Sequence, residues 1–143
     1  MLKGIPEIMT PELMKVLMEM GHGDELLLCD GNYPKFGCPE RCVRMDGHGI
    51  PEILDAILKF FPLDEYVENP TVFMAVLPDD PYKPVIWPEY EEIGKRYESE
   101  GLRQIAVQKP EFYERGRKCY CCIATSEKAL YANVILKKGV VRS

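Results

Sequence analysis

Helix-like and strand-like segments alternate along this chain of 143 residues, and the alternation constrains its fold more than any other feature. The strand-like segments are short apolar runs, and the run Glu25–Cys29 is continuous enough to be covered on both faces. Two helix-like segments begin at prolines, since Pro11 follows a capping residue, Thr10, and Pro51 precedes apolar residues at helical spacing. This pattern predicts an α/β fold in which helices pack on a mostly buried sheet, as one domain over residues 1–143.

Periodicity and turn residues place the individual elements. We expect helices at residues 10–20, 51–61, 89–100 and 110–117. We expect strands at residues 25–29, 43–45, 71–77, 103–107, 120–125 and 133–136. The third helix has few apolar anchors and is therefore expected on the surface, after a long proline-rich loop. The order of the strands in the sheet does not follow from the pattern.

Charge and motif content exclude several classes of function. The net charge is −5, whereas nucleic-acid binding needs a basic face. Apolar runs such as residues 26–29 are far shorter than the roughly 18 residues that span a bilayer. Early prolines and glutamates interrupt any secretory signal, so we expect a cytoplasmic chain. The glycine-rich phosphate loops, His-Glu-x-x-His and Gly-x-Ser-x-Gly are absent, which disfavours a bound nucleotide, a catalytic zinc ion or a serine nucleophile.

The six cysteines leave two interpretations open. An even number of cysteines does not indicate disulfides in a cytoplasmic chain. Cys38 and Cys42 have a spacing that zinc sites use, but no second matching pair lies nearby in the sequence. We therefore favour buried, inert thiols and no metal, with a small zinc site completed by a histidine as the alternative. If Cys119–Cys122 is a strand, Cys119 and Cys121 share one face and Cys122 takes the other.

The two histidines are the natural candidates for proton transfer near neutral pH. His22 lies between two glycines, which could leave its imidazole free for catalysis or let it cap the preceding helix. His48 belongs to a glycine-rich turn and is expected to face solvent. Asp30 directly follows the strand at 25–29, where open α/β sheets bind ligands, although it could equally cap the next turn.

Two further segments carry polar groups with weaker signals. Asp64 is interpreted most simply as a loop or helix-cap residue. Tyr131, Ala132 and Asn133 precede the last strand, and a phenol together with an amide can exchange several hydrogen bonds with a polyol. An ordinary turn is the alternative for this tripeptide.

Six segments carry recognisable motifs: the opening Met1–Ile5, the segment Pro11–Leu13, the turn Gly21–Glu25, the segments Arg44–Gly47 and Phe112–Arg115, and the closing run Tyr131–Val140. Together these motifs resemble the L-fucose mutarotase family. The resemblance extends from end to end of the chain. The wider family includes D-ribose pyranase, but the Phe-Tyr-Glu-Arg segment and the Lys-Lys-Gly tail are similar to the fucose branch.

The resemblance implies an α/β fold of the ribose-pyranase/fucose-mutarotase type and a cofactor-independent isomerase. The implied reaction interconverts the α and β anomers of L-fucose, or of a related reducing monosaccharide, by acid/base-catalysed ring opening and closure. The reaction involves no net redox change or group transfer, so no metal or nucleotide is needed. The implied assembly is a ring-shaped homo-oligomer, often a decamer, with its sites near subunit boundaries.

The resemblance also implies roles for individual residues. The catalytic histidine of the family corresponds to His22, and residues that bind the sugar correspond to Asp30, Tyr131, Ala132 and Asn133. Asp30 could orient His22 or hold a sugar hydroxyl. Tyr131 could act as a second proton-transfer group or only bind, since an unperturbed phenol with a pKa of about 10 is a poor base at neutral pH.

Three further residues complete the implied pocket. In some members an aspartate like Asp64 and a tyrosine like Tyr113 also line it. Lys109 replaces an arginine of the bacterial members, which keeps a charged donor but loses the planar fork. The segment 31–42 departs from the family pattern, and this leaves the sugar open. A pyranase that interconverts pyranose and furanose forms of ribose or another sugar, or a non-catalytic monosaccharide-binding protein, remains an alternative.

Overall fold

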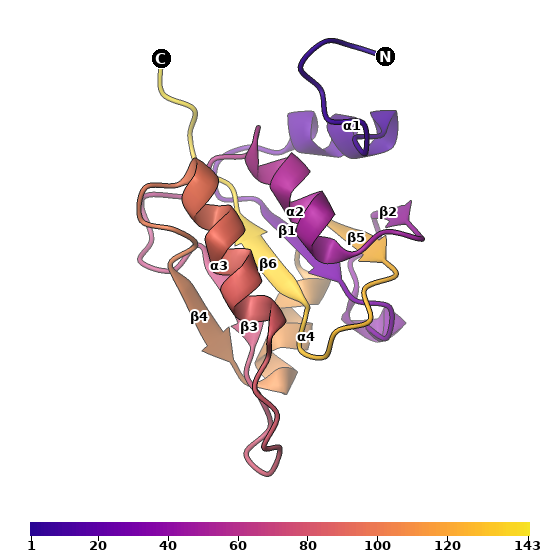
Figure 1. The fold of residues 1–143 in the computed structure, drawn as a ribbon, viewed down its shortest axis with the longest axis vertical. Coiled ribbons are helices and arrows are strands. Elements are labelled where there is room, and N and C mark those ends of the chain that lie inside the picture. Colours follow the sequence, from indigo (N-terminus) through magenta and orange to yellow (C-terminus); the bar gives the residue numbers. More distant parts are fainter.

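The computed structural model of residues 1–143 contains a mixed six-stranded sheet in the order β2-β5-β1-β6-β3-β4 (Figure 1). The strands are β1 (Glu25–Cys29), β2 (Cys42–Met45), β3 (Thr71–Met74), β4 (Gln104–Val107), β5 (Cys121–Thr125) and β6 (Val134–Lys137). Only β6 runs antiparallel to its neighbours, β1 and β3. The carboxyl ends of the other five strands therefore lie at one edge of the sheet, where β6 begins.

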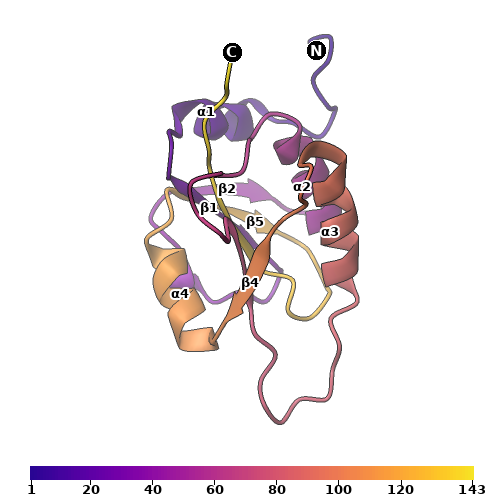
Figure 2. The same ribbon diagram turned by 90° about the vertical axis from the view of Figure 1, so that its left-hand side faces the viewer.

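Helices cover both faces of this sheet. They are α1 (Pro11–Glu19), α2 (Ile50–Leu58), α3 (Ile86–Tyr97), α4 (Lys109–Arg117) and a short 3-10 helix η1 (Lys35–Gly37). Helices α2 and α3 lie side by side on one face and α4 lies on the other, whereas α1 lies at the end where both termini emerge (Figures 1 and 2). None of these helices has the length and apolar character needed to cross a membrane.

The central strand β1 shows why both faces need cover. Leu26 and Leu28 are fully buried in the larger apolar cluster, on the side of α2 and α3. Leu27 and Cys29 point the other way and join a smaller cluster with Phe112 of α4. The continuous apolar run therefore forms a strand buried on both sides, and the predicted α/β fold with helices packed on a sheet is confirmed.

The helix termini follow the local signals in the sequence. The Oγ1 atom of Thr10 accepts a hydrogen bond of 3.1 Å from the amide of Leu13, and Pro11 occupies the first helical position. Helix α1 ends at Glu19, so Gly21 lies in the turn that follows. The predicted first helix is therefore confirmed, and its cap leaves His22 directly beyond the helix end.

Two expectations are wrong. Helix α3 begins at Ile86, inside the segment expected to be a loop, and Ile86, Tyr90 and Ile93 are buried. The helix is therefore part of the core, and the Tyr90 hydroxyl donates a hydrogen bond of 2.7 Å to the carbonyl of Ala132. Strand β5 begins only at Cys121, so Cys119 and Cys121 do not share a face, and Cys119 joins the smaller cluster instead.

One buried side chain in the sheet is unsatisfied. The Oγ1 atom of Thr71, in β3, has no hydrogen-bond partner, although the residue is fully buried. A buried hydroxyl without a partner costs free energy, so we expect Thr71→Val to raise the free energy of unfolding by about 1 kcal/mol in urea titrations. Thr125→Val is the matched control, because Thr125 donates to the carbonyl of Cys29 and accepts from the amide of Glu127. The free energy of unfolding of this control is expected to fall by about 1 kcal/mol. A lower free energy of unfolding in both variants would contradict the prediction.

Candidate functional site

The first candidate group pairs His22 with Asp64 at the amino end of β1. The turn after α1 is held by hydrogen bonds from the Gly21 amide to Asp24 Oδ2, at 2.8 Å, and from the Gly23 amide to the Lys138 carbonyl, at 2.8 Å. Gly23 has a φ of 88°, which only glycine adopts at little cost. This turn leaves the His22 side chain 47% exposed, with its Nε2 atom 2.9 Å from Oδ1 of Asp64.

Asp64 is almost fully buried, yet its surroundings favour the ionised form. Burial raises the pKa of its carboxyl group, but hydrogen bonds from the Tyr66 amide and from His22 outweigh burial, so the pKa lies below its usual range. A carboxylate only accepts hydrogen bonds, so Nε2 of His22 carries the proton in this pair. The Nδ1 atom of His22 is then the nitrogen available to take a proton from a substrate.

The backbone of Asp64 is anchored by the end of β6. Its amide donates a hydrogen bond of 3.0 Å to the Lys137 carbonyl, and its carbonyl accepts one of 2.9 Å from the Arg103 guanidinium. Asp64 lies in a loop, as predicted, and its Oδ1 atom accepts a hydrogen bond of 3.1 Å from the Tyr66 amide, but it also contacts His22. The Tyr66 ring lies beside His22, with 5.2 Å between ring centroids, and no sequence signal indicated that contact.

The second candidate group surrounds Asp30 at the opposite end of β1. Its amide donates a hydrogen bond of 2.7 Å to Oδ1 of Asn133, and its Oδ1 atom accepts one of 2.9 Å from the amide of Asn32. Partial burial raises the pKa of Asp30, although hydrogen bonds to its carboxylate from the Asn32 amide and the Asn133 side chain oppose the shift. Burial, followed by the charge of Asp30, raises the pKa of Tyr113, so its phenol stays protonated and can donate.

Tyr131 belongs to the same end of the sheet. Its hydroxyl donates a hydrogen bond of 2.7 Å to Oδ2 of Asp80 and accepts one of 3.3 Å from the Leu77 amide. The bond to Asp80 raises the pKa of Tyr131, so the phenol is a hydrogen-bond donor and a poor base at neutral pH. Ala132 is fully buried, and its side chain therefore cannot reach a sugar that lies outside the core. The partner Asp80 was not identified from the sequence, where it is one of several loop residues.

Lys109 and Tyr113 lie on one face of α4. The Nζ atom of Lys109 is 5.8 Å from the centroid of the Tyr113 ring, an arrangement that allows a cation–π contact. Tyr33 and Phe36, from the segment between β1 and β2, contact the same ring edge-on at 5.4 and 5.1 Å. Asp30, Asn133, Tyr131, Tyr113 and Lys109 are called the carboxyl-end group below, because all five lie where the parallel strands end.

One chain does not bring the two groups together. Five residues of β1 separate them, a rise of about 17 Å, which is longer than a monosaccharide can bridge. In Figure 1, α1, which precedes His22, lies at one end of the molecule, and the loop between β3 and α3, which carries Asp80, lies at the other. The expectation that Asp30 could orient His22 is therefore wrong within one chain, because Asp64 makes that contact.

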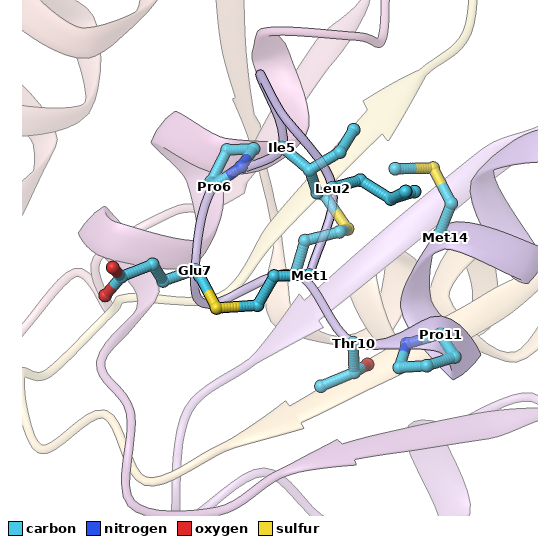
Figure 3. Close-up of a pocket in the computed structure, with 9 residues that line it drawn as sticks. Met1, Leu2, Ile5, Pro6, Glu7, Thr10, Pro11 and Met14 are labelled. Carbon is cyan, nitrogen blue, oxygen red and sulfur yellow. The ribbon is translucent and has the colours of Figure 1, made fainter.

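A groove of about 720 Å³ lies elsewhere, between the N-terminal segment and α1 (Figure 3). Its lining includes Met1, Leu2, Ile5 and Met14, whereas Glu7 and Thr10 are its few polar side chains. None of the predicted site residues lines it. A surface of this kind binds apolar groups rather than a polyol, so we do not identify it as the sugar site.

Three thiols, with a fourth beside them, form the one part of the chain suited to a soft metal ion. The Sγ atoms of Cys29, Cys38 and Cys122 all lie within 4.8 Å of one another. Cys42 is in register with Cys122 on the neighbouring strand. Hydrogen bonds from Cys29, Cys42 and Cys38 lower the pKa of Cys122 to about 6, although burial opposes the shift. These thiols lie apart from His22 and Asp64, on the face of the sheet that α4 covers.

Comparison with known proteins adds further findings. The model of the RbsD / FucU transport protein family matches residues 3–141. Fucose mutarotase from Danio rerio is 48% identical over 98% of this chain and 94% of that protein, and fucose mutarotase from Homo sapiens is 44% identical over the same shares. The crystal structure of fucose mutarotase in complex with L-fucose from Streptococcus pneumoniae is 46% identical, with a TM-score of 0.93 over 99% of this chain and 100% of that one.

Proposed function

Since this chain belongs to the RbsD / FucU family, we infer that it is a sugar mutarotase, an isomerase that interconverts the α and β anomers of L-fucose. Two relatives that match nearly the whole chain are fucose mutarotases, and one similar structure is a complex with L-fucose. The observation that carries the chemistry is the half-exposed imidazole of His22, held at 2.9 Å by a buried carboxylate. This pair supplies a positioned acid/base at neutral pH without any cofactor.

We propose that His22 moves one proton between two oxygens of the sugar. Its Nδ1 atom takes the proton of the anomeric hydroxyl, while Asp64 stabilises the imidazolium through Nε2. The bond between the anomeric carbon and the ring oxygen breaks, and the imidazolium delivers the proton to that oxygen. The open-chain aldehyde rotates about the adjacent carbon–carbon bond, and the reverse steps close the ring as the other anomer. A positioned acid/base typically accelerates such a step by ~10²–10⁴-fold.

The carboxyl-end group is suited to holding the sugar hydroxyls. Asp30 offers a carboxylate oxygen and Asn133 an amide, while the protonated phenol of Tyr113 can donate. The Tyr131 hydroxyl already donates to Asp80, so it can only accept a hydrogen bond from the sugar. Lys109 adds a charged hydrogen-bond donor at the same end of the sheet. These five side chains are proposed as binding residues, whereas His22 is the proposed catalytic residue and Asp64 the residue that positions it.

The complete site is proposed to form between two copies of the chain. The distance between His22 and Asp30 along β1 supports this proposal, since neither end alone has both a proton carrier and the hydroxyl-binding side chains. Each end also carries an exposed aromatic ring, Tyr66 at 67% and Phe36 at 63%, which a second subunit could cover. A closed ring repeats one such interface, and we propose a ring-shaped homo-oligomer, a decamer.

We further propose that the enzyme works in the cytoplasm. All six cysteines are free thiols, although the sulfur atoms of three of them lie within 4.8 Å of one another. Neighbouring thiols persist unlinked in a reducing compartment, which supports this placement.

The test of the function is anomer exchange in the unmodified protein, followed by saturation-transfer NMR. We expect exchange between the two anomers of L-fucose to rise well above the rate in buffer, and to exceed that for D-galactose and D-ribose. Faster exchange between pyranose and furanose forms of ribose would identify a pyranase instead. Calorimetric binding of L-fucose with exchange at the buffer rate would identify a non-catalytic sugar-binding protein.

A further inference from the structure

The thiols of Cys29, Cys38, Cys42 and Cys122 converge on the sheet face that α4 covers. Cys29 ends β1, and Cys122 lies on β5, the strand that pairs with β1. Cys42 begins β2 and pairs with Cys122 in register, so both side chains leave the sheet on the same side. Cys38 follows η1, in the loop before β2, and its sulfur atom lies near those of Cys29 and Cys122. Three sulfur atoms from separate segments therefore meet around one point, and the Cys42 thiol lies beside one of them, hydrogen-bonded to Cys122.

We propose that these four cysteines form a binding site for Zn²⁺. Zinc prefers a tetrahedral set of thiolates, with Zn–S distances of about 2.3 Å, which places the sulfur atoms about 3.8 Å apart. Three sulfurs already lie within 4.8 Å of one another, so these three need only a small contraction. The fourth, Cys42, contacts Cys122 and would have to turn toward the other two. Binding displaces the protons of the thiols and forms four Zn–S bonds, with no redox change.

The surroundings fit a metal held for structure. Cys29 and Cys122 are buried beside Phe112 and Ile135, whereas Cys38 and Cys42 are half-buried and give an ion a route of entry. Four thiolates and Zn²⁺ carry two negative charges, and Lys35 begins η1, the short helix directly before Cys38. Four protein ligands would leave no position for substrate, so the ion would not take part in catalysis.

Zinc at this place would fasten the segment between β1 and β2. That segment carries Tyr33 and Phe36, whose rings contact Tyr113 of the carboxyl-end group. It packs tightly on α4, because a side chain at Gly116 would collide with the Tyr33 hydroxyl and the Gly37 carbonyl. The inference is independent of the mutarotase reaction, since none of the four cysteines belongs to either candidate group.

The experiment uses the full-length protein, reduced and freed of metal with a chelator. Zinc is titrated in competition with a chromophoric chelator, and Co²⁺ is added separately as a spectroscopic probe. We expect one Zn²⁺ per chain, a higher Tm with zinc, and the thiolate-to-metal absorption of a tetrahedral cobalt site. Cys38→Ser and Cys42→Ser are the informative variants, since both positions are half-buried and tolerate a hydroxyl; each is expected to weaken zinc binding by more than ~100-fold.

Cys121→Ser is the matched control. Cys121 is adjacent to Cys122 and equally buried, but it points into the cluster on the opposite face. We expect zinc affinity to stay within a few-fold of that of the parent protein. The proposal is overturned by sub-stoichiometric zinc, by equal losses in Cys121→Ser and Cys42→Ser, or by loss of binding in His22→Gln. A cobalt spectrum without thiolate bands, or binding of Cu(I) but not Zn²⁺, would overturn it as well.

Discussion

Replacement of His22 by glutamine is expected to lower the rate of L-fucose anomer exchange by ~10²–10⁴-fold. Glutamine keeps a polar side chain of similar reach, and its amide can still donate to Asp64, but it cannot carry a proton between sugar oxygens. The side chain is 47% exposed and packs in neither apolar cluster, so the fold should survive. Saturation-transfer NMR measures the rate, and circular dichroism with thermal unfolding verifies the fold.

His48→Gln is the matched control for this variant. His48 is the only other histidine in the chain, and it lies in an exposed turn 3.6 Å from Glu52, with no contact to Asp64. Its replacement is expected to leave exchange unchanged within about a factor of two, as is usual away from a catalytic group. Normal turnover in the His22 variant, or an equal loss in both variants, would remove His22 from the mechanism.

Mixing two inactive variants is expected to restore activity. His22→Gln removes the proposed proton carrier at the amino end of β1, and Asp30→Ala removes a proposed sugar-binding carboxylate at its carboxyl end. An oligomer that contains only one of these variants should be nearly inactive. If one site takes His22 from one copy and Asp30 from its neighbour, mixed oligomers contain some sites with both residues intact. Co-refolding equal amounts should therefore recover about a quarter of the parental activity, from random pairing at each interface.

The double variant, His22→Gln with Asp30→Ala, provides the control for this experiment. Mixed with either single variant, it cannot form an intact site and should recover no activity. Native mass spectrometry of differently tagged chains establishes that mixed oligomers have formed. Absence of recovery in verified mixed oligomers would contradict a shared site and require the two ends to act separately.

Local signals predicted most of the elements correctly. Thr10 with Pro11 marked the start of the first helix, and the continuous run 25–29 marked a strand buried on both faces. The third helix was misplaced because Pro88 was interpreted as part of a loop, whereas a proline fits the first turn of α3. Its few apolar residues proved sufficient anchors, since Ile86 and Tyr90 fill the space over the sheet.

The sequence indicated the candidate residues one by one, but it did not indicate their arrangement. His22 and Asp30 were both identified from their neighbours in the sequence. Their separation by the length of β1, and the contact between His22 and Asp64, follow only from the pairing of strands. The same applies to the thiols, because Cys38 and Cys42 gain their partners from β1 and β5 rather than from a second pair nearby in the sequence.

The amino-acid sequence by itself determined which segments become helices and strands. It also determined which side chains can transfer protons or form hydrogen bonds with hydroxyl groups. These are properties of single residues and of the spacing between near neighbours, so they can be identified before folding. Only the tertiary structure decided that Asp64 is ionised beside His22, that the proposed sugar-binding residues lie at the far end of the sheet, and that three thiols meet. Charge state and proximity depend on burial and on contacts between residues that are distant in sequence, and strand order creates both.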